Sequence, residues 1–273
     1  MDILSPQNAR VKEWAQLLEK KHRDKQQKYI IEGIHLVQEA LRSGADLECV
    51  AFDVDQGIPN ELLHMTGAGT EVEWIGVSAA VIAKCSDTKT PQPVFAVVRK
   101  QSAAIGLLLQ RKNSLVIVLD GVQDPGNVGT IIRTADAAGA DGVIVGRGSA
   151  DIHNPKTIRS TMGSIFHLPV IEGDLLEIIP EAKEQGVRIV STSLQATSTC
   201  YGYDFTKASW LLVGNEAKGV SDAAQQLVDE SVIIPMKGRA ESLNVAMAST
   251  VMLFEAMRQR DFTTTIIPVQ PPK

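Results

Sequence analysis

Hydrophobic residues in the second half of the chain form short, almost unbroken runs, such as LVIVLD at 115–120 and SWLLVG at 209–214. Strands of a parallel sheet covered by helices on both faces show this pattern, whereas strands with one solvated face alternate. We therefore predict buried parallel strands at 115–120, 141–146, 187–192, 209–214 and 230–236. Between these runs the spacing of apolar residues predicts helices near 128–138, 154–162, 174–185 and 221–229, and a long final helix over about 242–260.

The first hundred residues alternate between shorter helical and strand-like stretches, which is typical of a small α/β domain. Helices are predicted at 6–20, 35–42, 60–65 and 79–84, and strands at 29–32, 47–53, 72–76 and 94–98. Residues 100–114 connect this region to the longer hydrophobic runs. We expect two α/β domains with a boundary near residue 110, the second domain being the larger.

Composition limits the partners of this chain. Its 273 residues are 44% hydrophobic and 22% charged, which is enough to bury a sizeable core. The formal net charge is −5, so any RNA or DNA site has to be a local basic patch. The candidate stretch is residues 1–30, where seven basic residues stand against four acidic ones. This segment is either a binding patch or the solvated face of a helix.

The cysteines and the termini carry little chemistry. Cys49, Cys85 and Cys200 stand far apart in the sequence, without a CxxC pair, so we expect no metal site, no disulfide framework and a reducing compartment. The N-terminal residues lack the hydrophobic region of a secretory signal, and the charge-free stretch 242–254 is too short to span a bilayer. That stretch is predicted to be a helix buried on all sides, and the protein is expected in the cytoplasm, without a membrane partner.

Three loops follow predicted strands in the second domain. They read GVQDPGNVGT after 115–120, GNEAKGV at 214–220 and MKGRAESLNVA at 236–246. Each alone could be ordinary turn chemistry, with Asn127, Ser242 or Asn244 as a helix N-cap. Ligands bind beyond the carboxyl ends of parallel strands, and these loops share that edge, so we predict one pocket.

Other motifs exclude several classes of enzyme. The sequence has no GxGxxG after a strand, no GxxxxGK[ST], no HExxH and no GxSxG. A nucleotide-like ligand therefore needs a pocket built from loops. Helical periodicity places Arg133 almost opposite the apolar side of its helix, which fits a solvated arginine as well as a functional one.

The motifs NVGTIIRTADAAGADGVIV, LLVGNEAKGV and IIPMKGRAESLNVAMASTVMLFEAMRQ, in this order, resemble the signature motifs of the SpoU (TrmH-like) RNA ribose methyltransferases of the SPOUT superfamily. The resemblance covers roughly 113–260. The segment NPKTIRSTMGSIFHLP also resembles the family, with Thr161 in place of its usual serine. The first domain resembles an L30e-like RNA-binding domain through NARVKEWAQLL and YIIEGIHLVQEAL.

The resemblance implies a fold and its partners. It gives an L30e-like RNA substrate-binding domain at 1–105 and a parallel-sheet SPOUT methyltransferase domain with a deep trefoil knot at 113–273. It also implies S-adenosylmethionine as cofactor and a homodimer with the active site at the subunit interface.

The resemblance also assigns residues. Arginine side chains do not give up their proton readily, so we expect Arg133 to hold the target phosphate and stabilise the developing alkoxide, and a role as base would require an unusual site. The implied catalytic set is Asn127, Arg133, Glu216, Ser242 and Asn244. The implied cofactor-binding set is Thr192, Leu194, Gly214, Ile234, Met236 and Leu243.

We therefore expect methylation of a ribose 2′-hydroxyl, in 23S ribosomal RNA by preference, because a separate L30e-like domain resembles the rRNA-directed members. A tRNA substrate, a methyltransferase that confers antibiotic resistance, an enzyme acting on a small nucleotide-like molecule and a non-catalytic RNA-binding protein of the same fold remain alternatives. Failure to bind S-adenosylmethionine would favour the non-catalytic alternative.

Overall fold

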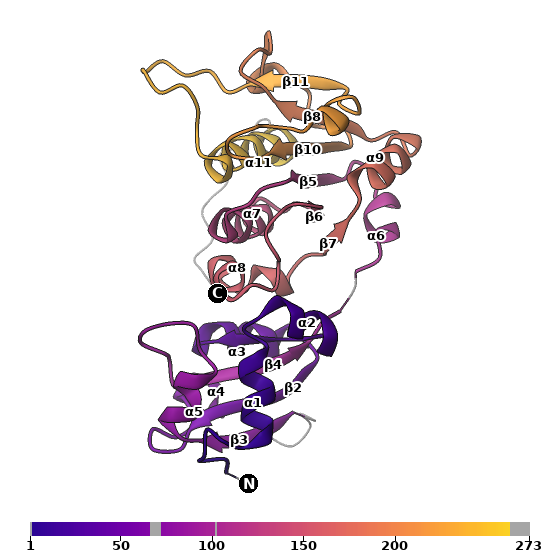
Figure 1. Cartoon of the computed structure of the whole chain (residues 1–273). Coiled ribbons are helices and arrows are strands. Elements are labelled where there is room, and N and C mark those ends of the chain that lie inside the picture. The colour runs from indigo at the N-terminus through magenta and orange to yellow at the C-terminus, as the bar shows by residue number, and fades with distance from the viewer. Residues whose placement is uncertain (1, 66–71, 102, 263–273) are drawn as a thin grey trace. The chain divides into compact units, whose positions relative to one another are not determined.

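The computed structural model describes residues 2–65, 72–101 and 103–262. Its contacts divide the chain into two units (Figure 1). The first takes in the described residues up to 101 together with 151–167, and the second takes in 103–150 and 168–262. A single boundary near residue 110 does not describe this division, because the segment 151–167 contributes Ile158 to the core of the first unit. The end of the predicted second domain, 263–273, lies outside the described residues.

The first unit is built on a four-stranded sheet in the order β1-β4-β2-β3, in which β4 runs antiparallel to both neighbours and β2 pairs with β3 in parallel. The strands are β1 (Lys28–Glu32), β2 (Leu47–Asp53), β3 (Glu73–Val77) and β4 (Val94–Arg99). The helices are α1 (Ala9–Gln16), α2 (Lys20–Gln26), α3 (Ile34–Arg42), α4 (Asn60–Leu63), α5 (Ala79–Lys84), α8 (Pro155–Thr161) and the 3-10 turn η1 (Ser164–Phe166).

Alternate residues of β1 face opposite sides of this sheet, as the two-residue period of a strand requires. Ile30 packs with Trp14 of α1, and Ile31 packs on the other side with Leu36 of α3 and Ile158 of α8. The sheet is therefore covered on both faces. The segment 151–167 forms part of one of these layers.

The predicted helix at 6–20 is wrong in its extent, because α1 ends at Gln16 and a second helix, α2, begins at Lys20. The buried guanidinium of Arg23 donates hydrogen bonds to the carbonyl oxygens of Leu17 and Leu18, both at 2.8 Å. An unbroken helix would use these carbonyls for the N–H groups four residues later. Arg23 also pairs with Asp151 at 2.8 Å, so the break between the helices supports the attachment of the segment 151–167.

The basic residues of 1–30 are largely neutralised within the first unit. Four of them pair with carboxylates: Arg10 with Glu73, Lys20 with Asp24, Arg23 with Asp151 and Lys28 with Glu48. The side chains of Lys12, Lys21 and Lys25 pair with no other described residue. The structure therefore favours the solvated face over a concentrated basic patch.

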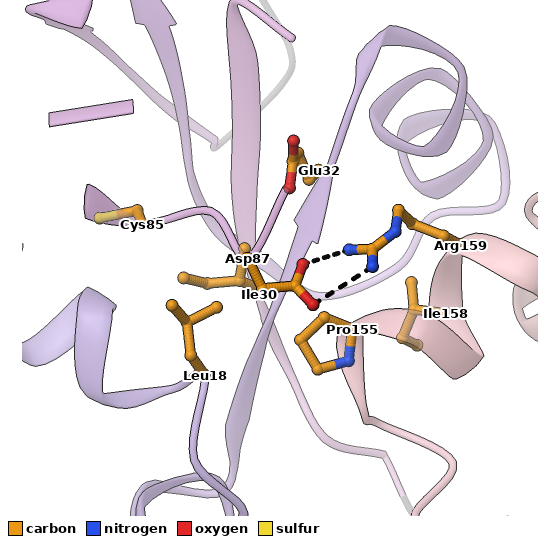
Figure 2. A pocket seen from close by; sticks show the side chains of 8 residues that line it. All are labelled: Leu18, Ile30, Glu32, Cys85, Asp87, Pro155, Ile158 and Arg159. Carbon is orange, nitrogen blue, oxygen red and sulfur yellow. Dashed lines mark hydrogen bonds and ion pairs between the residues drawn. The ribbon is translucent and has the colours of Figure 1, made fainter. Parts of the chain in front are cut away.

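Figure 2 shows α8 where it packs against the other elements of the first unit. Arg159 forms a two-point ion pair with Asp87, beside a cavity that Glu32, Cys85 and Ile158 help to line. The cavity has a volume of about 10 Å³, which holds at most one water molecule. It is a packing feature and offers no room for a larger ligand.

The second unit contains a seven-stranded sheet, all parallel, in the order β7-β6-β5-β10-β8-β11-β9. The strands are β5 (Leu115–Asp120), β6 (Gly142–Gly146), β7 (Val170–Gly173), β8 (Arg188–Thr192), β9 (Ser198–Thr199), β10 (Ser209–Gly214) and β11 (Glu230–Ile233). The helical elements are α6 (Gly106–Leu109), α7 (Pro125–Ala137), α9 (Leu175–Glu184), η2 (Cys200–Gly202), α10 (Asp222–Gln225) and α11 (Val245–Asp261).

The predicted parallel sheet is confirmed, with β5 and β10 at the predicted bounds. Sequence reasoning missed β7 and β9, two short strands at the two edges of the sheet. It also overextended the helix predicted at 221–229, of which only α10 is helical. The deep trefoil knot stays a prediction. Among the residues described, no helix has the length and the apolar character needed to cross a membrane.

The final helix α11 differs from the expectation of a helix buried on all sides. Met247 is 50% exposed and Phe254 is 41% exposed, seven residues apart and therefore on one face. The opposite side, with Met252 and Leu253, is buried. The charge-free stretch thus covers the core with one side and leaves an apolar stripe on the other.

Candidate active site

Three loops leave the sheet of the second unit at one edge (Figure 1). β5 and β10 run in register up to Asp120 opposite Gly214, and β8 joins β10 to β11. Because all four strands are parallel, their carboxyl ends open on the same side. The predicted convergence of the three loops is therefore confirmed by the topology.

A cavity of about 700 Å³ lies among the ends of β8, β10 and β11. This volume is within the range of about 300–1,000 Å³ that small-molecule sites occupy. Every residue of the predicted cofactor-binding set lines it: Thr192, Leu194, Gly214, Ile234, Met236 and Leu243. Three members of the predicted catalytic set line it as well: Glu216, Ser242 and Asn244.

Gly214 ends β10 where the chain folds back tightly on itself. A Cβ atom at this position would lie 2.1 Å from the carbonyl carbon of Gly219 and 2.2 Å from the amide nitrogen of Val220. Backbone atoms cannot move aside as the end of a side chain can, so only glycine fits here. The wall that Gly214 gives to the cavity depends on this close approach.

Asn215 holds the same loop in place, and sequence reasoning did not single it out. Its Nδ2 donates a hydrogen bond to the carbonyl of Gly121 at 2.8 Å, which ties the loop after β10 to the loop after β5. Its Oδ1 accepts from the amides of Ala217 and Lys218, as an asparagine in a turn commonly does. A Gly-Asn pair directly after a buried strand was the signal that could have found it.

Glu216 connects the second loop to the start of α7. Its carboxylate accepts hydrogen bonds from the amides of Gln123 and Asp124, both at 3.2 Å, and from Nδ2 of Asn127 at 2.9 Å. Partial burial raises the pKa of Glu216, but these hydrogen bonds outweigh burial and hold the pKa below its usual 4.5. At neutral pH Glu216 is therefore an ionised acceptor with occupied oxygens, which suits it to positioning and not to taking a proton.

Asn127 and Asn244 extend this connection to the third loop. Nδ2 of Asn244 donates to Oδ1 of Asn127 at 3.1 Å, while Oδ1 of Asn244 accepts from the amide of Ala246 at 2.9 Å as the N-cap of α11. The N-cap of α7 is Asp124, which leaves the Asn127 side chain to bridge Glu216 and Asn244. The hydrogen bonds therefore run continuously through all three loops.

Ser242 and Arg133 lie differently. Ser242 is exposed at the cavity, and its hydroxyl meets no partner among the described residues. Arg133 is exposed on α7, six residues and therefore about 9 Å along the helix from Asn127, and is not among the residues that line the cavity. The structure brings four of the five predicted catalytic residues together within the chain and leaves Arg133 apart.

Sequence reasoning also missed Lys218 and Gln225, which line the same cavity. Lys218 stands two residues after the predicted Glu216 in the motif, whereas Gln225 gave no signal. Among the residues that the structure describes, no group of three or more His, Cys, Asp or Glu side chains is placed to hold a metal ion.

Residues 114–254 match the SpoU rRNA Methylase family over more than half of the chain. The chain belongs to this family. Residues 8–96, in the first unit of this SpoU family member, match the MRM3-like substrate binding domain.

Two named relatives match this SpoU family member over more than nine-tenths of both chains. It is 38% identical over 252 residues to the 23S rRNA (guanosine(2553)-2′-O)-methyltransferase RlmP of Bacillus subtilis, covering 92% of this chain and 97% of the relative. It is 32% identical over 268 residues to the 23S rRNA (uridine(2479)-2′-O)-methyltransferase of Streptomyces viridochromogenes, covering 94% and 92%. The crystal structure of the SpoU methyltransferase AviRb from Streptomyces viridochromogenes, in complex with AdoMet, superimposes with a TM-score of 0.85 at 31% identity over 93% of this chain and 98% of that one.

Proposed function

We propose that this protein transfers a methyl group from S-adenosylmethionine to a ribose 2′-hydroxyl of 23S ribosomal RNA in the cytoplasm. The observation that carries the proposal is the cavity of about 700 Å³ at the carboxyl edge of the sheet, joined by Glu216 to the loop that bears Asn127. The names of the relatives, both 23S rRNA 2′-O-methyltransferases, support the choice of reaction and of RNA.

The cavity fits the proposed cofactor. Leu194, Ile234 and Leu243 offer apolar surface for a purine ring, and Thr192 offers a hydroxyl within the same wall. Leu194 is 58% exposed and Leu243 is 41% exposed, so both keep surface that a bound adenosine would bury. When bound, S-adenosylmethionine supplies the methyl group on its sulfonium sulfur.

The residues around the cavity would position the acceptor. In the reaction a bond forms between the 2′-oxygen and the methyl carbon, the carbon–sulfur bond breaks, and the hydroxyl proton leaves. Glu216 holds the Asn127 amide in one orientation, and Ser242 has a hydroxyl available to hydrogen-bond the ribose. Fixing two reacting groups in line can supply several kcal/mol of a barrier without a strong base.

Arg133 would act from a second protomer. It is exposed and off its own cavity, and Met247 and Phe254 leave an apolar stripe on α11, which packs against the helix that carries Arg133. A homodimer that covers this stripe would bury apolar surface and could bring Arg133 to the partner's cavity. There its guanidinium would hold a phosphate of the target and stabilise the charge that develops on the 2′-oxygen.

The first unit would contribute RNA binding. Its match to a substrate binding domain supports this role, and we keep the predicted boundaries of an L30e-like domain at 1–105 and a knotted SPOUT domain at 113–273 as part of the proposal. The segment 151–167, which joins the first unit from the middle of the second domain, would couple substrate binding to the methyltransferase domain.

The deciding experiment transfers labelled methyl from S-adenosylmethionine into ribosomal RNA and tRNA isolated from cells that lack this protein, followed by alkaline digestion. Label in alkali-resistant dinucleotides of 23S rRNA is the expected result. Label in single nucleotides would mean base methylation, and label in tRNA alone would replace the substrate. Binding of S-adenosylmethionine without methyl transfer to either RNA would contradict both the 23S rRNA substrate and the tRNA substrate.

A further inference from the structure

Most basic side chains of the second unit are occupied by partners of the same unit. They include Arg111 with Asp141, Arg147 with Asp174, Lys183 with Asp229, Lys207 with Asp204, Arg258 with Glu255, and Arg260 with backbone carbonyls. The five cations that pair with carboxylates contribute little attraction at a distance, because the neighbouring negative charge cancels their field, and the Arg260 guanidinium is taken up by carbonyl oxygens.

The cations without a partner have a different distribution. Within the described part of this unit they are Lys112, Arg133, Lys218, Lys237 and Arg239. All except Lys112 lie on the three loops of the candidate active site or on the helix that follows the first of them. In a chain with a net charge of −5, the described part of the second unit therefore presents most of its unpaired positive charge where the proposed RNA substrate has to approach.

Lys237 and Arg239 occupy the part of the third loop that does not line the cavity. The loop leaves the cavity at Met236 and returns to it at Ser242, and residues 237–241 between them are all exposed. In Figure 1 the connection between β11 and α11 stands clear of the sheet. Since three residues of extended chain span at most about 10 Å, both cations lie within roughly that distance of the rim. This is close to one Debye length at physiological salt.

We propose that Lys237 and Arg239 bind phosphodiester groups of the RNA strand that carries the acceptor ribose. The inference rests on the proposed function, because it takes the cavity as the place where that ribose is held. An RNA strand leaving the cavity presents one phosphate per nucleotide, and Lys and Arg on an exposed loop are the side chains that position such a backbone. Glu241 on the same loop leaves the five residues with a net positive charge.

The test compares two full-length double variants that each remove two positive charges. Lys237→Gln/Arg239→Gln changes the loop. Lys112→Gln/Lys207→Gln is the matched control, with one unpaired and one paired cation outside the three loops. Binding of in vitro transcribed 23S rRNA is measured without cofactor between 50 and 200 mM salt, alongside the Kd for S-adenosylmethionine, the oligomeric state, and KM and kcat for methyl transfer.

We expect the loop variant to bind the RNA about tenfold more weakly at 100 mM salt. The slope of log affinity against log salt should fall by about 1.4 to 1.8, which corresponds to two lost phosphate contacts. The Kd for S-adenosylmethionine, the oligomeric state and kcat at saturating RNA should match the control. RNA affinity and slope equal to the control would overturn the inference while leaving the methyltransferase in place.

Two other outcomes would also overturn it. A weaker Kd for S-adenosylmethionine with unchanged RNA binding would mean that the loop cations contact the cofactor. A loss of dimer would mean that they pair with the partner subunit. The proposed function would fail by a different result. If the wild-type protein binds the RNA and the Lys237→Gln/Arg239→Gln variant binds it more weakly, but the wild type transfers no methyl group, the RNA-binding surface stands and the methyl-transfer reaction is excluded.

Discussion

The carboxylate of Glu216 accepts a hydrogen bond from Nδ2 of Asn127 at 2.9 Å, across 89 positions of the sequence. The Oδ1 atom of the same Asn127 accepts a hydrogen bond from Nδ2 of Asn244, which is 117 positions from Asn127 in the sequence. These two bonds fix the Asn127 amide in one orientation, since its donor and its acceptor are both engaged. We therefore expect Glu216, Asn127 and Asn244 to contribute to catalysis by positioning the three loops. Removing the charge of Glu216 tests this role.

Glu216→Gln should lower kcat for methyl transfer about tenfold or more, because the loop after β5 loses its anionic acceptor and a misplacement of the order of 1 Å is costly in rate. Thermal stability should change little, because Glu216 lies in an exposed loop and glutamine still offers one oxygen as an acceptor. Glu177→Gln on α9, an exposed change of the same charge, is the control. A Glu216→Gln enzyme with the wild-type rate would contradict the positioning role.

The pH dependence follows from the direction of the Glu216 pKa. Its folded value lies below the ordinary 4.5, so its contribution to loop stability is fully present above pH 4.5 and is lost as the pH falls through the folded value. The activity profile above pH 5 should therefore contain no limb that Glu216→Gln removes. If Glu216→Gln changes the shape of the activity profile above pH 5, Glu216 exchanges a proton during turnover.

Gly214→Ala should abolish binding of S-adenosylmethionine and destabilise the second unit by about 2 kcal/mol or more, because the added Cβ meets backbone atoms that cannot repack locally. Gly202→Ala is the control, since its Cβ would meet nothing closer than the Thr199 hydroxyl at 3.7 Å. Calorimetric binding and thermal unfolding measure both effects. Unchanged cofactor affinity in Gly214→Ala would remove Gly214 from the cofactor site.

Local pattern was sufficient for much of the fold. β5 and β10 are buried on both faces, and their unbroken apolar runs predicted the residues at which each begins and ends. β7 and β9 escaped because a strand of a few residues at a sheet edge has too little burial to impose a pattern. Helical periodicity also did not predict that α1 ends at Gln16. The cause is the Arg23 guanidinium, which takes the carbonyls of Leu17 and Leu18, and such a side-chain contact leaves no mark in the periodicity.

Long-range partners account for the rest. The ion pair between Arg23 and Asp151 joins positions 128 residues apart, and no local pattern reports that the segment 151–167 belongs to the first unit. At the site, the motif resemblance supplied the residues, and parallel strand order predicted that their loops would meet. The bonds of Glu216 and Asn215 could not be predicted, since they depend on the path of each loop. The proposed role of Arg133 requires a second protomer, on which the pattern of a single chain carries no information.

Mixing two inactive variants tests that role of Arg133. Arg133→Ala removes the guanidinium, and Asn244→Ala disables the cavity. If Arg133 serves the partner's cavity, a mixed dimer has one working site, made of the intact cavity of one subunit and the intact Arg133 of the other. Random exchange makes about half of the dimers mixed, so about a quarter of the wild-type rate should return. If Arg133 serves its own cavity, both sites of the mixed dimer are defective and no activity returns. Each variant alone should remain inactive under the same exchange conditions.

The pair of Arg23 and Asp151 should be essential to the first unit. Both side chains are nearly buried, at 3% and 8% exposure, and removing one partner of a buried pair typically costs about 3–5 kcal/mol. Asp151→Asn should therefore lower the free energy of unfolding by about 3 kcal/mol. The double variant Arg23→Met/Asp151→Leu, which leaves no unpaired charge, should recover most of that loss. Denaturant unfolding followed by the fluorescence of Trp14 and Trp74, both in this unit, measures it.

His153 should make the stability of the first unit sensitive to mildly acidic pH. Its ring lies 4.5 Å from that of Tyr29, it is 9% exposed, and burial lowers its pKa from 6.5 to about 4. A lowered histidine pKa means that the unfolded chain takes up a proton first, so stability is complete above pH 6.5 and declines as the pH falls toward 4. Between pH 7 and pH 5 the loss should be about 2 kcal/mol.

His153→Phe keeps an aromatic ring against Tyr29 and removes the titrating group, so its unfolding free energy should vary less over this pH range whatever its absolute stability. His64→Gln, at an exposed position of the same unit, should leave the wild-type dependence in place. Denaturant titrations at pH 7, 6 and 5 measure all three proteins. A wild-type stability that is flat from pH 7 to pH 5, or a His153→Phe variant as steep as the wild type, would mean that His153 is already solvated and free to charge in the folded unit.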